Sequence, residues 1–154
     1  MYLKDGDGMK IFLISGSVSG EKRYGKLKDV GSYMPPYGLL CIASVLEKGG
    51  HEVKVLDTEI HNYSNIDICN QIDSYKPDLI GMSVFTIGSS EAIERAKAIK
   101  LHCATHIVAG GPHIFVDIDN YSKNTEFDFF VVGEGEQTTS ELVDVLENGK
   151  QLSN

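Results

Sequence analysis

Glycine and small polar residues follow three apolar segments of this sequence. They lie at residues 133–136 (GEGE), 110–113 (GGPH) and 83–86 (SVFT), each directly after a short run of apolar residues. If these runs are parallel strands, their carboxyl ends meet at the edge of the sheet where ligands bind. Glycine at such positions lets a ligand contact the backbone itself. The pattern therefore predicts a binding site built from three strand ends.

The composition is that of one globular domain without a membrane or nucleic-acid partner. The chain has 154 residues, a net charge of −8 and 42% hydrophobic residues. The acidic balance argues against nucleic acid, because phosphate contacts need clustered Lys and Arg. No apolar stretch is long enough to span a membrane and no signal peptide is recognisable, so we expect a cytoplasmic protein.

The cysteines predict no metal centre. Cys41, Cys69 and Cys103 are far apart, and no pair has CxxC spacing. A zinc site or an iron–sulfur cluster made by this chain alone is therefore not expected. Each cysteine lies in or beside an apolar helical pattern, so we expect buried, reduced thiols.

Strand and helix signals alternate along the chain. Strands are expected at residues 10–14, 52–57, 78–84, 106–109 and 127–132. Helices are expected to open at Pro35-Pro36, Ser64 and Ser90, with a weaker helical segment at residues 114–121 and a last helix that carries Leu142, Val145 and Leu146 and stops at Gly149. Such alternation requires parallel strands joined by right-handed crossovers. We expect a flavodoxin-like (Rossmann-like) α/β fold, an open parallel sheet of order 2-1-3-4-5 with helices on both faces and a crevice between strands one and three.

A nucleotide or flavin is the first ligand to consider in such a sheet. Residues 16–20 (GSVSG), after the first strand, do not form the G-x-G-x-x-G fingerprint, and no helical period follows them. The fingerprint needs a tight turn that leads directly into a helix N-terminus. Residues 16–33 are instead predicted to form a long loop, which in compact domains is usually functional or mobile. A nucleotide- or flavin-binding domain is therefore the least favoured interpretation.

Short motifs occur in a characteristic order, at residues 35–39 (PPYGL), 50–53 (GHEV), 77–83 (PDLIGMS), 110–113 (GGPH) and 132–136 (VGEGE). From about residue 9 onward the chain resembles the N-terminal cobalamin-binding (B12-binding) domain of B12-dependent radical SAM proteins. The resemblance implies a disordered or cloning-derived N-terminus (1–8), a cobalamin-binding-like domain (9–150) and the start of a linker (151–154).

The same resemblance implies a longer parent enzyme. In that family the domain precedes a radical SAM barrel with a CxxxCxxC motif, which this sequence lacks. The missing C-terminal domain would bind a [4Fe–4S] cluster and S-adenosylmethionine. The parent would resemble a C-methyltransferase or an anaerobic magnesium-protoporphyrin ester cyclase, and this part alone would catalyse nothing. The alternative is a cobalamin-free docking or substrate-recognition module of a radical SAM protein.

The resemblance and the strand-end pattern together imply the cobalamin contacts. Hydroxyls and glycines would hold the nucleotide tail, and backbone N–H groups near residues 134–137 could take a phosphate or amide oxygen. The acids Glu134 and Glu136 repel a bare phosphate and suit ribose or amide donors better. We predict no catalytic residue and no metal ligand, although each glycine alone could equally serve a turn. The predicted contacts are Ser15, Gly16, Pro36, Tyr37, Gly38, Ser83, Val84, Thr86, Gly110, Gly111, Pro112, His113, Gly133, Glu134 and Gly135.

The histidines set an expectation for cobalt. Better-known cobalamin-binding domains carry an Asp-x-His-x-x-Gly motif after strand one, and this sequence has none. Cobalt would therefore not be ligated from that loop. Only His61 and His113 are expected at strand carboxyl ends, and for His113 we favour a loop imidazole that bonds the backbone over a cofactor contact. His51, His102 and His106 are expected on the solvated surface.

Overall fold

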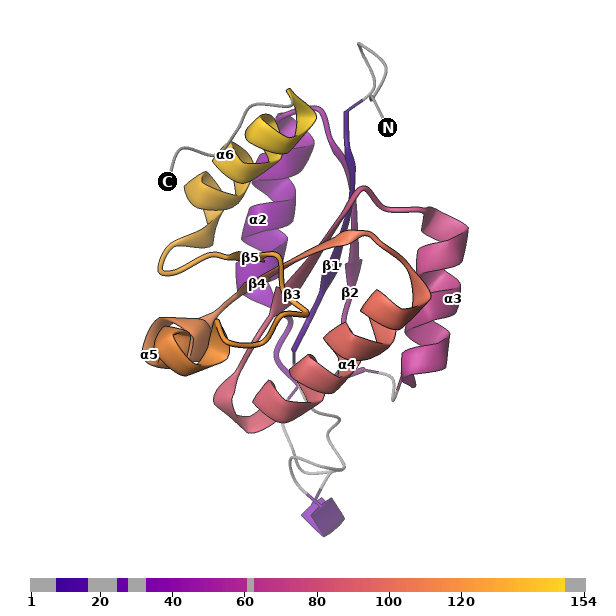
Figure 1. Cartoon of the computed structure of the whole chain (residues 1–154), viewed down its shortest axis with the longest axis vertical. Coiled ribbons are helices and arrows are strands. Elements are labelled where there is room, and N and C mark those ends of the chain that lie inside the picture. Colours follow the sequence, from indigo (N-terminus) through magenta and orange to yellow (C-terminus); the bar gives the residue numbers. More distant parts are fainter. Residues whose placement is uncertain (1–7, 17–24, 28–32, 61–62, 149–154) are drawn as a thin grey trace.

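Five parallel strands form one open sheet in the order β2-β1-β3-β4-β5 (Figure 1). The computed structural model describes residues 8–16, 25–27, 33–60 and 63–148. The strands are β1 (Lys10–Ile14), β2 (Glu52–Leu56), β3 (Leu79–Ser83), β4 (His106–Gly110) and β5 (Phe129–Phe130). This order confirms the flavodoxin-like α/β fold that the alternation of elements predicts.

Helices cover both faces of the sheet. Two of them, α2 (Tyr37–Lys48) and α6 (Gly135–Glu147), pack against each other and against one face. The other face is covered by α3 (Asn65–Tyr75), α4 (Ser89–His102) and α5 (Pro112–Tyr121). Short 3-10 turns lie at Gly25–Leu27 (η1) and Thr86–Gly88 (η2). No helix in the described ranges is both long and apolar enough to cross a membrane.

Alternation along the central strands divides the core in two. In β1, Ile11 and Leu13 face α2 and α6, whereas Phe12 and Ile14 face the opposite layer. All of them are at most 2% exposed. Because successive side chains of a strand point to opposite faces, a strand covered by helices on both sides is apolar throughout. The burial of both faces therefore explains why residues 11–14 of β1 are all apolar, while Lys10 at its start is exposed.

Local signals fix the start of α3 as predicted. The Ser64 Oγ accepts the Asp67 N–H at 3.2 Å, and an Asp67 carboxylate oxygen accepts the Ser64 N–H at 2.9 Å. This reciprocal pair is a capping box, which satisfies two backbone donors that the first helical turn leaves open. Hydrogen bonds from the Ser64 side chain and backbone lower the pKa of Asp67.

Several expectations about the core and the last elements were wrong. Strand β5 is two residues long rather than spanning residues 127–132, because the chain leaves the sheet edge directly after it. In α6 Leu142 is buried, but the buried valine is Val143, and Val145 is only half-buried. Cys41 is exposed because it lies opposite the buried face of α2.

The Asp128 carboxylate forms hydrogen bonds with residues at the start of β4 and near the end of α4. One of its carboxylate oxygens accepts the Lys100 Nζ at 2.6 Å and the Ile107 N–H at 2.7 Å. Its other oxygen lies 3.3 Å from the His106 Nδ1. Burial of the carboxyl group works against ionisation, but the hydrogen bonds from these three groups and the Lys100 charge outweigh it and lower the pKa of Asp128.

We predict that Asp128→Asn destabilises the fold at neutral pH by about 1.5–3 kcal/mol, the usual range for hydrogen bonds to a charged group. Because the folded-state pKa is lowered, this stability is present above the ordinary Asp pKa and is lost as the pH falls through the folded value. Urea unfolding at several pH values should therefore show the difference between wild type and variant shrinking in acid. Asp119→Asn is the control, since exposed Asp119 makes no hydrogen bond or ion pair within the described residues. A difference that is constant with pH would contradict the assignment.

Candidate functional site

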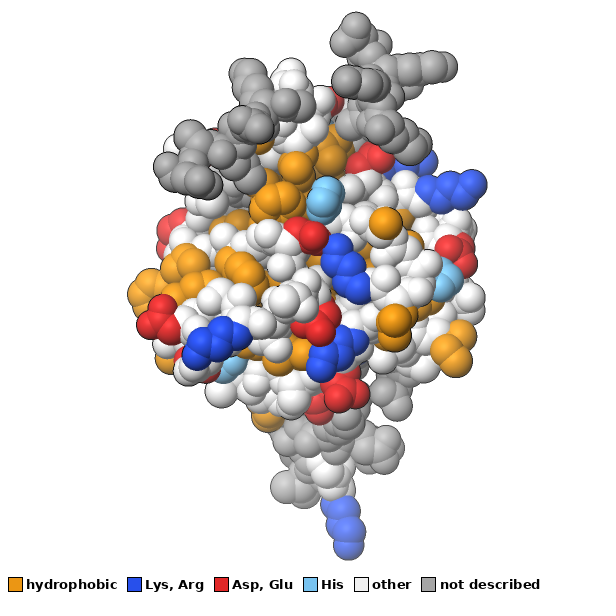
Figure 2. Space-filling view, viewed as in Figure 1, with side chains coloured by type: hydrophobic (Ala, Val, Ile, Leu, Met, Phe, Trp, Pro, Cys, Tyr) orange, Lys and Arg blue, Asp and Glu red, His pale blue; other side chains and the backbone are white. Residues whose placement is uncertain are grey.

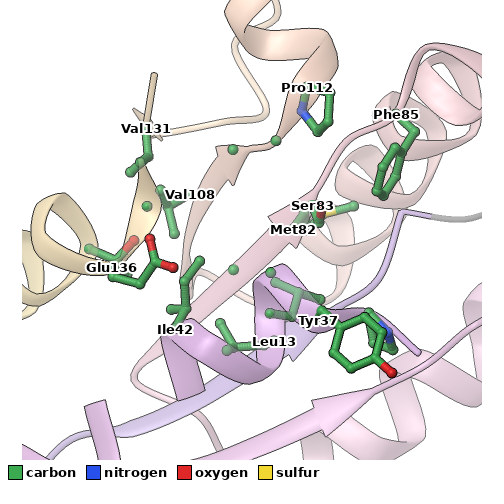
Figure 3. A pocket seen from close by; sticks show the side chains of 18 of the residues that line it. Leu13, Tyr37, Ile42, Met82, Ser83, Phe85, Val108, Pro112, Val131 and Glu136 are labelled. Carbon is green, nitrogen blue, oxygen red and sulfur yellow. The ribbon is translucent and has the colours of Figure 1, made fainter. Parts of the chain in front are cut away.

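A cavity of about 460 Å³ opens at the carboxyl edge of the sheet, on the face covered by α2 and α6 (Figure 3). Its size lies within the usual range of small-molecule sites, roughly 300–1,000 Å³. Strands β1, β3 and β4 form its floor, and the two helices and the strand-end loops form its walls. The lining residues are Leu13, Met34, Pro35, Pro36, Tyr37, Gly38, Leu39, Ile42, Glu59, Gly81, Met82, Ser83, Phe85, Ile87, Val108, Gly110, Gly111, Pro112, Val131, Gly133, Glu134, Gly135, Glu136 and Thr139.

One row of residues across the sheet makes the floor. Leu13 pairs in register with Gly81, and Gly81 pairs with Val108, so the three lie side by side on neighbouring strands. Gly81 contributes no side chain, and a Cβ built there would lie 2.6 Å from the Leu13 Cδ2. The glycine thus lets Leu13 lean across β3 and keeps the floor low and apolar.

The inner wall and the mouth differ in exposure. The inner wall, defined by the buried lining residues, includes Leu13, Val108, Val131 and Thr139, all at most 4% exposed. The mouth carries large apolar side chains that are open to solvent, namely Met34, Tyr37, Phe85 and Ile87. Exposed apolar groups around a cavity are typical of a surface that a ligand or another domain covers.

The charged side chains of the lining are all acidic. Glu59, Glu134 and Glu136 line the cavity, and the described lining includes no Lys, Arg or His. The positive charge at the cavity comes instead from backbone: Glu134 is the N-cap of α6, so the first N–H groups of that helix lie at the cavity and lack partners within the helix. This combination favours neutral ligands with amide or hydroxyl donors over free anions.

Two of the predicted glycines are explained by the fold itself. Gly111 has φ +105°, and a Cβ there would lie 2.9 Å from both the Val84 N and the Val84 O. A Cβ on Gly16 would lie 1.6 Å from the Ser83 O, where the ends of β1 and β3 touch. At both positions only glycine fits, so their residue type does not by itself indicate a ligand.

Gly38 has no such explanation. It lies in the first turn of α2 and lines the cavity, and a Cβ built there meets no described heavy atom within 4 Å. Its φ is not in the positive range. Glycine in a helix costs about 1 kcal/mol relative to Ala, so the fold alone would favour a larger residue here. The open space above Gly38 is the place where a ligand can approach the helix backbone.

The structure brings ten of the fifteen predicted contacts to the cavity: Pro36, Tyr37, Gly38, Ser83, Gly110, Gly111, Pro112, Gly133, Glu134 and Gly135. Ser15, Gly16, Val84, Thr86 and His113 do not line it. Their contact with a cofactor stays a prediction, as does that of the ten.

The five residues outside the cavity have structural contacts of their own. The buried Ser15 hydroxyl accepts the Thr58 N–H at 2.9 Å, which joins the ends of β1 and β2. The Val84 backbone bonds the loop after β4 in both directions, through Gly110 O and His113 N. The His113 Nδ1 lies 3.3 Å from the Thr86 hydroxyl, and its ring stacks edge-on against Tyr121. The other strand-end histidine, His61, lies outside the described residues.

Sequence reasoning missed most of the apolar lining. Leu13, Gly81 and Val108 belong to strands, and their period-2 alternation could have placed them on the α2 side of the sheet. Val131 directly follows β5. Thr139 could have been found from the face of α6 that carries Gly135. Glu136, which was weighed beside the ligand from the sequence without being included among the predicted contacts, does line the cavity. The mouth residues Met34, Phe85 and Ile87 lie in or beside loops and carry no periodic signal. The other missed lining residues are Leu39, Ile42, Glu59 and Met82, whereas Pro35 was expected to lie over the ligand together with Pro36 and Tyr37.

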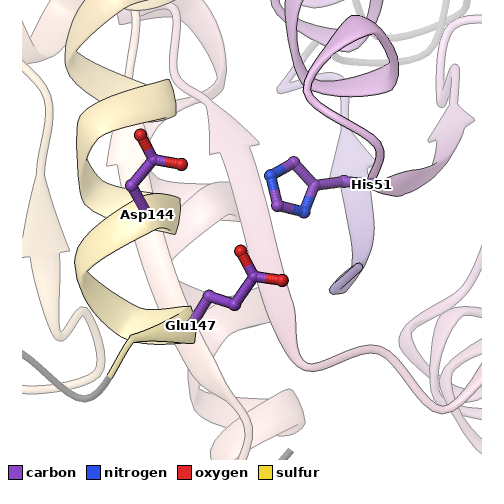
Figure 4. A group of neighbouring side chains, drawn as sticks. All are labelled: His51, Asp144 and Glu147. Carbon is purple, nitrogen blue, oxygen red and sulfur yellow. The ribbon is translucent and has the colours of Figure 1, made fainter. Parts of the chain in front are cut away.

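A second polar group lies at the amino end of the sheet. His51 was expected on the surface but is 8% exposed, and its ring faces Asp144 and Glu147 of α6 with ligand atoms within 4.8 Å of one another (Figure 4). The His51 Nδ1 accepts the Met9 N–H at 3.2 Å, so the proton of the neutral ring is on Nε2. A metal would have to bind Nε2, the nitrogen that faces the carboxylates, but the proton on this nitrogen leaves it no free lone pair for a metal. The group is therefore better explained as a polar contact between α6 and the β1 end than as a metal site.

The sequence matches the B12-binding domain family over residues 27–143. Because the match covers most of its length, the chain belongs to the B12-binding domain family.

Curated relatives are longer enzymes. The chain is 34% identical over 125 residues to an uncharacterized methyltransferase of Pyrococcus horikoshii, a match that covers 80% of this chain and 27% of that protein. It is 34% identical over 130 residues to the anaerobic magnesium-protoporphyrin IX monomethyl ester cyclase of Synechocystis sp., with 78% of this chain and 25% of the cyclase covered. The chain thus spans about a quarter of the length of these relatives.

Solved structures share the fold. The radical S-adenosylmethionine methyltransferase TsrM from Kitasatospora setae, with cobalamin and a [4Fe-4S] cluster bound, superposes with a TM-score of 0.73 at 19% identity, covering 94% of this chain and 25% of TsrM. The cobalamin-dependent S-adenosylmethionine radical enzyme OxsB, with aqua-cobalamin bound, gives a TM-score of 0.78 at 16% identity, covering 95% of this chain and 20% of OxsB.

The two kinds of cavity glycine predict opposite stability changes. Gly38→Ala should raise the free energy of unfolding by about 0.5–1 kcal/mol, because Ala is the better helix former and meets nothing. Gly111→Ala should lower it by about 1–3 kcal/mol, the cost of a non-glycine residue in a sparsely populated backbone region. Urea unfolding of wild type and of each variant measures these changes in the free energy of unfolding. Equal changes of the same sign would contradict the distinction.

Proposed function

We propose that this chain binds cobalamin and is the cofactor-binding domain of a larger radical SAM protein, without catalytic activity of its own. The single observation that carries the proposal is the apolar cavity at the carboxyl edge of a B12-binding domain, floored by the Leu13–Gly81–Val108 row. Cobalamin, when bound, supplies a cobalt ion that can carry a methyl group. The residues of this chain would hold and orient the cofactor.

The residues at the cavity fit such a cofactor in two parts. A corrin ring with its side chains is too broad for a cavity of about 460 Å³, so only the nucleotide tail would enter it. The ring would then rest on the mouth, where Tyr37, Phe85 and Ile87 are exposed. The amide side chains of a corrin are hydrogen-bond donors, and the carboxylates of Glu59, Glu134 and Glu136 are acceptors.

The remaining parts of the parent protein are inferred from its relatives. Since those relatives are about four times longer than the matched region, we infer a C-terminal radical SAM domain that binds a [4Fe–4S] cluster and S-adenosylmethionine. The inferred reaction is that of a methyltransferase or of a cyclase similar to the magnesium-protoporphyrin ester enzyme. Residues 1–8 and 151–154 would lie outside the domain. The cysteines of the described ranges are free thiols, which supports a cytoplasmic location.

One observation favours a second candidate, a docking module that binds no cobalamin. Apolar side chains gather near α5 and the segment that leads from β5 to α6 (Figure 2), where Phe115, Val116 and Val132 are 67%, 77% and 46% exposed. A neighbouring domain could cover this surface whether or not a cofactor is present. Measurement of cobalamin binding separates the two candidates.

We predict that Gly38→Leu weakens cobalamin binding at least about tenfold while the protein remains folded, because the side chain would fill the open space at the mouth. The chain is incubated with hydroxocobalamin and desalted, and the retained corrin absorbance is recorded. A titration of the protein with hydroxocobalamin, followed by the visible absorbance, gives the dissociation constant of wild type and variant. Cys41→Leu is the matched control on the same helix, since Cys41 is exposed and lies outside the cavity lining. Failure of both this chain and the full product of its gene to retain cobalamin would refute the proposal and leave the docking module.

We further predict that bound cob(II)alamin has no histidine ligand from this chain. Among the described residues no histidine lines the cavity, and His113 is turned to Thr86 and Tyr121. Electron paramagnetic resonance should show cobalt lines without nitrogen splitting, and His113→Ala should leave the spectrum unchanged. Splitting that disappears in His113→Ala, or in the matched His61→Ala variant, would contradict this prediction.

A further inference from the structure

One buried side-chain nitrogen in the described part of the chain has no hydrogen-bond partner, the Nε of Arg95 in α4. The Arg95 side chain as a whole is half-buried, so part of it still reaches the surface. Buried polar groups are nearly always bonded, and one that is left unpaired costs stability. Burial lowers the pKa of Arg95, although the charge of Glu91 opposes this. The guanidinium therefore weakens the fold of this chain unless an acceptor comes from elsewhere.

Arg95 lies on the flank of α4 that faces α3. His102, two helical turns further along and on nearly the same side, has its Nε2 2.8 Å from a carboxylate oxygen of Asp73 in α3. The opposite flank of α4 carries Lys100, which bonds Asp128 directly before β5. Helices α3 and α4 lie side by side on the face of the sheet opposite to α2 and α6 (Figure 1). Arg95 thus lies outside the lining of the cavity.

The outer surface of the same two helices carries apolar side chains. Ile66 of α3 is 73% exposed and Leu101 of α4 is 91% exposed. Each lies two residues from a buried isoleucine of its helix, Ile68 or Ile99, and therefore points away from the core. A protein that covered α3 and α4 would find apolar contacts on the same layer as the unpaired guanidinium, and arginine is enriched in protein interfaces.

The unpaired donor defines the acceptor that would satisfy it. Nε and one terminal nitrogen of a guanidinium form a planar fork that fits two oxygens of a carboxylate or a phosphate. A rotation about the last side-chain torsions of Arg95 would turn this edge to the surface. Glu91 and Glu94 lie on the same helix and the net charge of the chain is −8, so a multiply charged phosphate is repelled more strongly than a carboxylate. A carboxylate on a protein surface therefore fits best.

We propose that the outer surface of α3 and α4 binds another part of the parent protein, which places a carboxylate on the guanidinium of Arg95. The chain spans about a quarter of the length of its curated relatives, so a longer parent would offer a large surface for this contact. The inference rests on the proposed function only in requiring that parent, and cofactor binding does not enter it. The contact would offset, in the parent, the stability that Arg95 costs this chain alone.

The experiment measures the effect of Arg95→Met in two proteins. In this chain alone, the variant should raise the melting temperature by roughly 2 °C or more, because an unpaired buried donor is lost while the apolar stem is kept. In the full product of the gene it should instead lower the melting temperature of this domain and speed hydrogen exchange in α3 and α4, because the partner carboxylate loses its bond. Lys97→Met, which removes an exposed charge from the same helix, is the matched control and should do neither.

The two proteins together separate the possible failures. Equal stabilisation by Arg95→Met in both would show that Arg95 stays unpaired in the parent, and destabilisation of the chain alone would show a partner within it; either result overturns the inference. Inorganic phosphate that raises the melting temperature of wild type but not of Arg95→Met, against chloride at equal ionic strength, would show a free-anion site instead. Failure of wild type to bind hydroxocobalamin would count against the proposed cofactor role and leave the Arg95 result standing. A gene product no longer than this chain would overturn the longer parent and this inference together.

Discussion

The parallel pairing of β1 with β3 is the contact on which the rest of the structure depends. The two strands lie side by side from Ile11 and Leu79 to Ile14 and Met82, yet the chain leaves them toward opposite faces, to α2 after β1 and to α4 after β3. The helices that follow the two strands therefore lie on opposite faces of the sheet, and the point between such strands is where ligands bind in open parallel sheets. Just beyond the pairing, Gly16 touches the Ser83 carbonyl so closely that no side chain fits. The close contact of Gly16 with the Ser83 carbonyl thus lies at the carboxyl edge of the sheet, where Ser83 also lines the cavity.

Glycine serves three different physical ends within a small volume. At Gly111 it permits a backbone conformation with positive φ, and at Gly81 it makes room for the side chain of Leu13. At Gly38 the space that a side chain would occupy is not filled by any described atom. A sequence motif cannot distinguish these cases, because each contributes the same letter. Only the position of surrounding atoms separates a glycine that the fold requires from one that the fold would replace.

Elements with a local or periodic signal could be predicted from the sequence, whereas features that need tertiary packing could not. The strand order follows from alternation, and the α3 cap follows from Ser64 and Asp67. Burial of His51 depends on α6, which comes about ninety residues later, and could not be anticipated from its place beside a turn. The cavity was predicted as a row of strand ends, yet much of its wall comes from side chains that point down from helices or in from loops. Thr139 carries no motif at all.

The two edges of the sheet bear on how the protein behaves in solution. At one edge β5 offers only Phe129 and Phe130, so few unpaired N–H and C=O groups are available to a foreign strand. At the other edge Lys54 projects from the middle of β2, with its Nζ over the rings of Phe12 and Tyr75. Short edges and inward-lying lysines are devices that prevent strands of separate molecules from pairing. In the described part of the chain both edges of the sheet thus carry features that disfavour its growth into a shared sheet or a fibre.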